Sequence, residues 1–209
     1  MMKNEVLYLL LDRYADHEAV FLASAIACDE RNVKEHPKYI NKVVAPTLAA
    51  VRSCSGFSTL PDYSFDTMPD DYAALVLIGG FGWLDRNLSD SVAPIVRRAM
   101  SKGIIVGAIC NAAAFMASHG FLNGIRHTGN GLEQLRAWGG AGYTNEAGYV
   151  DAQAVSDGCV VTANGTGYLE FAKELLILLE NDTPEQIERF YIFNKLGLVE
   201  CMRRMRQQV

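Results

Sequence analysis

The sequence lacks any long hydrophobic run. Its longest apolar stretches, such as residues 6–11 and 73–78, fall far short of the roughly 20 residues that a helix needs to cross a bilayer. The start of the chain carries a single lysine before Asn4 and Glu5, and Asp12 soon follows the first apolar run. This is a poor signal peptide. We therefore expect a cytoplasmic protein with no membrane partner.

Positive charge and paired cysteines are also scarce. The net charge is −5 and the isoelectric point is near 5.4, which disfavours nucleic acid as a partner. The five cysteines are odd in number, widely spaced and without a C-x-x-C pair. Neither a disulfide framework nor a zinc site fits this pattern, and the histidines show no metal-binding spacing. We expect reduced thiols and no bound metal.

What the chain does have is enough apolar residues for a full core. Hydrophobic residues make up 50% of its 209 residues, which suits one domain of ordinary size, with or without an appendage. Apolar segments alternate with helical patterns. Strands are predicted at 5–12, 41–47, 50–54, 57–60, 73–78, 103–109, 149–155 and 159–163, and helices at 17–28, 84–100, 111–119, 132–138 and 168–180. This order predicts a doubly wound, mostly parallel α/β sheet sandwiched by helices.

Local signals refine the ends of these elements. Asp16 is placed to cap the first helix, and Ser156-Asp157-Gly158 predicts the turn between the last two strands. A break before Pro184 divides an α/β domain, residues 1–181, from a C-terminal helical extension, residues 182–209. Thr183 can cap that added helix, with Gln186 completing a capping box. Its apolar stripe fits packing on the same domain and leaves a role in association open; the stripe comprises Ile187, Phe190, Tyr191, Phe193 and Leu196.

Cys110 stands out among the thiols. The β-branched segment 104–109 runs directly into a helix of small residues, so Cys110 must lie on a tight, strained turn like the nucleophile elbow of hydrolases. The start of a helix supplies partial positive charge and free N–H groups, which lower a thiol pKa. The pattern alone leaves two interpretations open. Cys110 is either a reactive thiol or a small buried hydrophobe at the end of a core strand.

Backbone amides near Cys110 are candidates for binding a substrate oxygen. In parallel sheets, ligands bind beyond the carboxyl ends of the strands. Gly79 and Gly80 end one predicted strand, and their N–H groups, with that of Asn111, could form an oxyanion hole. The alternative is a tight strand-to-helix turn, because a lone Gly-Gly pair is weak evidence for an anion site.

Two side chains are candidates for proton transfer. Glu18 lies in the first turn after the first strand, either as an ordinary helix-start carboxylate or as a protonated carboxyl that donates to the Cys110 thiolate. His127 follows Cys110 by seventeen residues and is a candidate general base, although a lone loop histidine is more often structural or solvated.

Four motifs in this order resemble the ThiJ/PfpI superfamily, which includes the parkinsonism-associated deglycase and the intracellular protease PfpI. The motifs are Asp16–Val20, Leu77–Gly80, Gly107–Asn111 and Leu122–Gly124. The resemblance covers about residues 4–181 and implies the flavodoxin-like fold of class I glutamine amidotransferases. It implies Cys110 as nucleophile, Glu18 as the neighbouring acid, and the amides of Gly80 and Asn111 as the oxyanion hole. It also implies a homodimer.

The resemblance extends to a bacterial branch of the superfamily through Trp83 and the stretch 126–130, which places Trp83 among the expected substrate-binding residues. Two departures bear on the activity. PfpI-type proteases carry histidine directly after the cysteine, where this chain has Asn111. Glutamine amidotransferases carry a late His-x-Glu, and the corresponding segment 164–168 has no histidine.

The first departure weakens the case for a Cys-His protease dyad, and the second disfavours glutamine hydrolysis. The leading hypothesis is a cofactor-free glyoxalase or deglycase that acts on small carbonyl compounds through Cys110 and Glu18. The first alternative is a peptidase or amidase that uses His127 as its base. The second is a redox-responsive stress protein in which Cys110 is oxidised without turnover.

Overall fold

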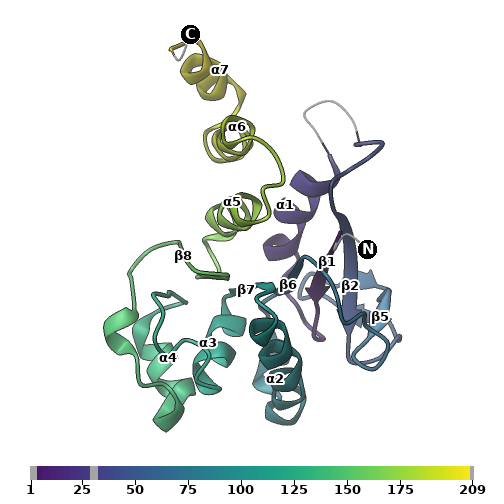
Figure 1. Cartoon of the computed structure of the whole chain (residues 1–209), viewed down its shortest axis with the longest axis vertical. Helices are drawn as coiled ribbons and strands as arrows, with labels where there is room; N and C mark the ends of the chain where they lie inside the picture. Colours follow the sequence, from purple (N-terminus) through teal and green to yellow (C-terminus); the bar gives the residue numbers. More distant parts are fainter. Residues whose placement is uncertain (1–3, 29–32, 208–209) are drawn as a thin grey trace.

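The computed structural model describes residues 4–28 and 33–207, and this part of the chain forms a doubly wound α/β fold (Figure 1). A seven-stranded sheet has the order β5-β2-β1-β6-β7-β9-β8, and every strand in it is parallel to its neighbours except β8. Its strands are β1 (Glu5–Leu9), β2 (Ile40–Ala45), β5 (Tyr63–Ser64), β6 (Ala74–Leu77), β7 (Ile105–Ile109), β8 (Ala154–Asp157) and β9 (Val160–Ala163). A separate hairpin joins β3 (Val51–Arg52) to β4 (Ser58–Thr59). The predicted fold class is confirmed.

Helices cover both faces of this sheet. The helices are α1 (Asp16–Ala27), α2 (Arg86–Ser101), α3 (Asn111–Ser118), α4 (Leu132–Gly139), α5 (Tyr168–Leu178), α6 (Pro184–Leu196) and α7 (Leu198–Gln207). Figure 1 shows α1 and α5 on one face and α2, α3 and α4 on the other, with α6 and α7 stacked beyond α5. None of the helices in the described residues combines the length and apolarity that a membrane span requires.

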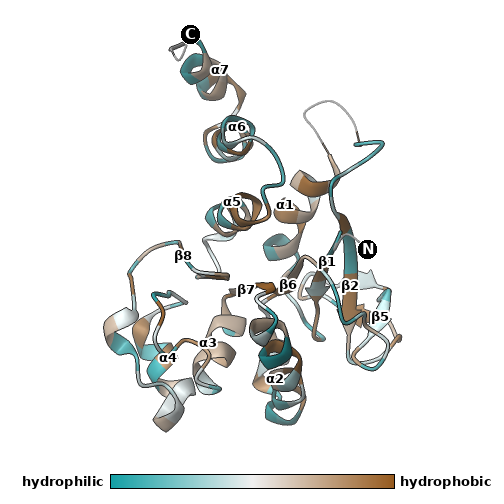
Figure 2. Cartoon of the chain, in the orientation of Figure 1, coloured by the Kyte–Doolittle hydropathy of each residue, from teal (hydrophilic) through white to brown (hydrophobic). Residues whose placement is uncertain are grey.

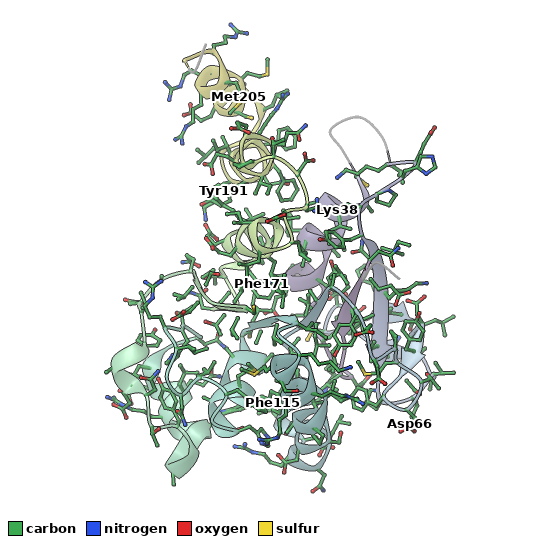
Figure 3. The ribbon with its side chains drawn as sticks, viewed as in Figure 1. Lys38, Asp66, Phe115, Phe171, Tyr191 and Met205 are labelled. Atoms are coloured by element: carbon green, nitrogen blue, oxygen red, sulfur yellow. The ribbon has the colours of Figure 1, made fainter. Side chains whose placement is uncertain are left out.

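The core lies on both sides of the sheet, which explains the continuous apolar strands. Along β1 and the residues after it, Val6, Tyr8 and Leu10 pack towards α1 and α5, while Leu7, Leu9 and Leu11 pack towards α2 and α3. The hydrophobic colour of Figure 2 follows these strands. Figure 3 labels Phe171 of α5 on one side of the sheet and Phe115 of α3 on the other, and both are almost fully buried.

The strand order places three loop ends together. The chain leaves β1 towards β2 and β5 and then returns to the other side of β1 as β6, so the direction of winding reverses between β1 and β6. Loops at the carboxyl ends of strands beside such a reversal form the usual ligand crevice. The segments that follow β1, β6 and β7 carry Glu18, Gly79 and Cys110, respectively.

One strand prediction and one turn prediction need correction, and one strand was missed. The strand expected at 149–155 begins only at Ala154, and it continues through Asp157. The turn therefore consists of Gly158 and Cys159, because Asp157 pairs directly with Val160 and the positive φ of 56° at Gly158 suits glycine. The edge strand β5 was not predicted, since two residues give no alternating pattern.

Two capping predictions are also corrected. Asp16 is the first residue of α1 rather than its cap. Its carboxylate instead accepts hydrogen bonds from the side chains of Ser53 and Ser55. Thr183 does cap α6, accepting the Gln186 N–H at 3.3 Å. Gln186 does not complete a capping box, because the Thr183 N–H donates to Asp182 Oδ1 at 2.9 Å.

The C-terminal extension consists of two helices rather than one. Helix α6 packs on α5 through buried Ile187, and both Tyr191 Oη and Lys195 Nζ donate to Glu170 Oε1 at 2.8 Å. Figure 3 labels Tyr191, on the helix next to α5. In α7, Val199 is 85% exposed. The homodimer stays a prediction.

The close approach of α5 to β7 depends on Gly107. A Cβ there would lie 2.8 Å from Phe171 Cζ and 3.0 Å from Leu175 Cδ1. We expect Gly107→Val to lower the free energy of unfolding by about 1–3 kcal/mol, because it overpacks the core. The free energy of unfolding of Gly107→Ala should lie between those of Gly107→Val and the wild type. Urea unfolding measures the series, and equal stability of all three proteins contradicts this packing.

Candidate active site

Cys110 lies on the abrupt turn that its sequence context predicts. Its φ and ψ are 60° and −125°, a conformation with positive φ that glycine adopts far more easily than other residues. The turn is held from both sides, because the Cys110 N–H donates to Ala163 O at 2.9 Å and its carbonyl accepts the Ala113 N–H at 3.1 Å. Cys110 therefore directly precedes α3, with its side chain only partly buried.

Glu18 reaches Cys110 from the buried side of the site. Its residue exposure is 2%, one carboxylate oxygen accepts the Gly79 N–H at 2.8 Å, and the carboxyl group is hydrogen-bonded to the Cys110 side chain. Glycines make room for this pair. A Cβ at Gly79 would lie 2.6 Å from Cys110 Cβ, and one at Gly165 would lie 3.1 Å from the sulfur.

Burial controls the protonation of this pair. Burial raises the pKa of Glu18 to about 7, although hydrogen bonds from Cys110 and Gly79 act in the opposite direction. Burial and then the charge of Glu18 raise the pKa of Cys110 to about 11, while bonds from Asn130 and the Asn111 N–H lower it. The expected net lowering of the thiol pKa by the helix start is therefore wrong. Near neutral pH these values keep the proton on the Cys110 sulfur and leave the Glu18 carboxyl group close to half-ionised.

The oxyanion-hole expectation is wrong for Gly79. Its N–H is committed to Glu18, so it is not free to bind a substrate oxygen. Gly80 differs. The backbone hydrogen bonds on either side of it are donated by Ala15 N to Gly79 O and by Phe81 N to Arg13 O, both at 3.0 Å. Neither uses the Gly80 N–H. The roles of the Gly80 and Asn111 amides stay predictions.

The Asn111 side chain orients the Gly80 peptide. Asn111 Nδ2 donates to Gly80 O at 2.9 Å, and Asn111 Oδ1 accepts from Gln134 Nε2 at 2.9 Å. Gly80 itself has a φ of 126° and lies so close to the backbone of Tyr14 that a Cβ would come within 2.6 Å of it. Sequence reasoning missed Gln134, because its contact is made across the fold by α4 and leaves no local pattern.

His127 is not placed as a base for Cys110. The residue is fully buried, with Nδ1 2.9 Å from Ile125 O and Nε2 2.7 Å from Tyr143 Oη. Both ring nitrogens are thus engaged within the core, and burial lowers the pKa of the imidazole. This corrects the expected catalytic role, because a general base needs a nitrogen that reaches the reacting group.

Trp83 is likewise a core residue rather than a substrate-binding one. It is 1% exposed, its Nε1 donates to Ile78 O at 2.7 Å, and its ring lies 4.7 Å from that of Phe115. The indole therefore stabilises the end of β6, next to the glycine pair. Within the described residues, no group of three or more histidine, cysteine, aspartate or glutamate residues could hold a metal ion.

Asn130 contacts the Cys110 sulfur directly. Its Nδ2 donates to Cys110 Sγ at 3.3 Å, and its Oδ1 accepts the Gly165 N–H at 2.9 Å. Sequence reasoning included it only in the stretch that resembles a bacterial branch and gave it no role. An amide in a polar loop carries no signal of its own, since loop residues become site residues only through the fold.

The fold and the site together define a doubly wound α/β protein with an elbow cysteine paired to a buried glutamate. A model of the DJ-1/PfpI family matches residues 4–178, and the chain belongs to that family. It is 36% identical over 194 residues to "Uncharacterized protease YdeA" of Bacillus subtilis (strain 168), which covers 93% of this chain and 92% of the relative.

Other similar proteins differ in how much of the chain they match. "Deglycase PH1704" of Pyrococcus horikoshii is 28% identical over 127 residues, covering 59% of this chain and 70% of the relative. The crystal structure of the thiJ/pfpI family protein from Bacillus anthracis has a TM-score of 0.87 and 27% identity, covering 99% of this chain and 97% of that chain.

The raised pKa of Glu18 makes folding stability depend on pH. Because the folded state holds the Glu18 proton more tightly than the unfolded state, its contribution is complete below the unfolded pKa of 4.5 and is lost as pH rises through about 7. The loss amounts to up to about 3 kcal/mol. We expect Glu18→Gln to remove this loss. Between pH 5 and pH 8 the free energy of unfolding of the variant should therefore fall less than that of the wild type.

Urea unfolding at the two pH values measures this difference. Glu185→Gln, an exposed substitution in the first turn of α6, is the control and should follow the wild type. Parallel behaviour of Glu18→Gln and the wild type would contradict a buried carboxyl with a raised pKa.

Proposed function

We propose that this chain is a cysteine-dependent, cofactor-free enzyme that converts small α-oxoaldehydes to hydroxy acids. The observation that carries the proposal is the hydrogen bond between Cys110 and buried Glu18, whose raised pKa of about 7 suits a group that accepts and returns protons near neutral pH. A relative named as a deglycase supports chemistry on carbonyl compounds.

In the first step, Cys110 attacks the aldehyde carbon. A C–S bond forms, the thiol proton passes to the Glu18 carboxylate, and the carbonyl π electrons move to the oxygen. The N–H groups of Gly80 and Asn111 are the proposed donors to this oxyanion. Return of the proton from Glu18 to the oxygen completes a hemithioacetal and regenerates the carboxylate.

In the second step, Glu18 removes the hydrogen on the former aldehyde carbon as a proton, and protonation of the neighbouring ketone oxygen gives an enediol. Glu18 then returns its proton to the neighbouring carbon, while the hydroxyl group on the first carbon loses its proton and becomes the thioester carbonyl, which replaces the proton taken up by the ketone oxygen. The first carbon is thereby oxidised to a thioester while the adjacent ketone is reduced to an alcohol, so no external oxidant is needed. Water then cleaves the C–S bond. The hydroxy acid leaves, and Cys110 recovers its proton.

The geometry gives less support to the two alternatives. A peptidase must protonate a leaving amine, and both ring nitrogens of His127 are already engaged in the core. A redox sensor needs a thiolate at neutral pH, whereas burial and Glu18 raise the pKa of Cys110 to about 11. Peptide cleavage that is lost in His127→Ala would restore the peptidase hypothesis. Cytoplasmic location and homodimer formation stay predictions.

Turnover of methylglyoxal to lactate tests the proposed activity. We expect Cys110→Ser and Glu18→Gln each to lower kcat at least 100-fold, because one removes the nucleophile and the other the proton carrier. Cys159→Ser is the matched control, since Cys159 is an exposed thiol in the turn between β8 and β9. Unchanged lactate formation by Cys110→Ser overturns the proposal.

Alkylation of Cys110 tests the electrostatic part of the mechanism. In the wild type we expect a pH midpoint above that of a free thiol, about 8.5, because burial and the Glu18 charge hold the proton on sulfur. Glu18→Gln should lower this midpoint while abolishing turnover. Iodoacetamide labelling across pH, followed by peptide mass spectrometry, measures both proteins. A midpoint that rises in Glu18→Gln contradicts the pairing.

A further inference from the structure

We propose that Asn130 is a catalytic residue of this site, whose side-chain amide donates to the Cys110 sulfur and then to the oxygen of the hemithioacetal. The second role rests on the proposed function, whereas the first rests on geometry alone. Asn130 Nδ2 lies 3.3 Å from Cys110 Sγ, so the amide touches the atom that reacts.

The orientation of the Asn130 amide is fixed by its other contact. Oδ1 accepts the Gly165 N–H at 2.9 Å, so the oxygen must face Gly165 and the NH₂ group must face the sulfur. A flipped amide would set two donors against each other at Gly165. The donor is therefore held towards Cys110 before any substrate binds, which is the arrangement that stabilises developing negative charge.

Asn130 and Glu18 approach the sulfur from different environments. Glu18 is buried, with 2% exposure, while Asn130 is exposed. Because Asn130 is the exposed neighbour of the sulfur, the proposal places the new oxygen of the substrate beside this amide. The amide carries no charge at any working pH. It can lower the energy of an anion at sulfur or oxygen without competing for the proton that Glu18 transfers.

The segment that carries Asn130 is anchored just before it. Thr128 N donates to Thr162 Oγ1 at 2.8 Å, and Thr128 Oγ1 donates to Ala152 O at 3.0 Å. His127 adds its two buried hydrogen bonds one residue earlier. Histidine and threonine thus hold the backbone in place, and Asn130 supplies the functional group at the end of the anchored stretch.

Two substitutions separate a catalytic role from a structural one. Asn130→Asp keeps an oxygen for the Gly165 N–H, removes the donor to sulfur and adds a charge. Asn130→Leu removes the donor without adding charge. We expect both to raise the pH midpoint of Cys110 alkylation and to lower kcat for methylglyoxal about 10- to 100-fold with little change in KM. The thermal midpoint of Asn130→Asp should stay close to that of the wild type.

Asn123→Asp is the matched control. Asn123 is also a bridging loop amide, with Nδ2 donating to Gly142 O at 2.8 Å and Oδ1 accepting the Thr144 N–H at 2.9 Å, but its partners are not site residues. It should leave alkylation and turnover unchanged.

The outcomes decide the proposal in either direction. Wild-type alkylation and turnover in both Asn130 variants overturn it. Loss of activity in Asn130→Leu alone, accompanied by a lower thermal midpoint, also overturns it, because only the loop anchor then matters. If the wild type itself fails to convert methylglyoxal, the proposed function fails, and the alkylation midpoint still reports on Asn130. A raised midpoint then supports its contact with the reactive sulfur, and an unchanged one refutes it.

Discussion

The hydrogen bond between Glu18 and Cys110 is the constraint around which the site is arranged. A carboxyl group with 2% exposure needs hydrogen-bond partners, and the Gly79 amide and the Cys110 thiol provide them. These partners come from the ends of neighbouring strands, so the reversal in strand order is what brings them together. The glycines at positions 79 and 165 fit the same demand, because a side chain at 79 would collide with the pair and one at 165 would press closely against it.

This arrangement changes how an elbow cysteine is activated. The usual expectation is that a helix start and nearby donors produce a resident thiolate. Here burial and an acidic neighbour oppose ionisation, and the pKa values of the two groups move upwards together. In the proposed mechanism, the sulfur becomes nucleophilic by giving its proton to the Glu18 carboxylate as it attacks. A thiol with such a raised pKa is seldom ionised near neutral pH, which limits its reaction with other electrophiles.

The strands and the elbow were predictable because their signals are local. Buried parallel strands read as unbroken apolar runs, and a strand that enters a helix without a loop leaves Cys110 little conformational choice. Glu18 was found through its position after the first strand. Gly79, His127 and Trp83 were misjudged because their roles depend on partners elsewhere in the fold, such as Glu18, Tyr143 and Ile78.

Asn130 and Gln134 show the other limit of sequence reasoning. Both are polar residues in or beside a loop, a context that describes much of any protein surface. Their importance follows from donor and acceptor geometry with residues far away in the chain. A motif identifies the atom that reacts, while the groups that steady it are fixed only when the chain is folded.

The backbone at Cys110 has an evolutionary consequence. A positive φ at a residue with a Cβ costs on the order of 1–3 kcal/mol, and glycine would relieve that cost at once. Stability alone therefore favours losing the thiol. A lineage that no longer needs the thiol should therefore drift towards glycine at this turn, whereas a lineage that uses the thiol must keep cysteine against the preference of the backbone.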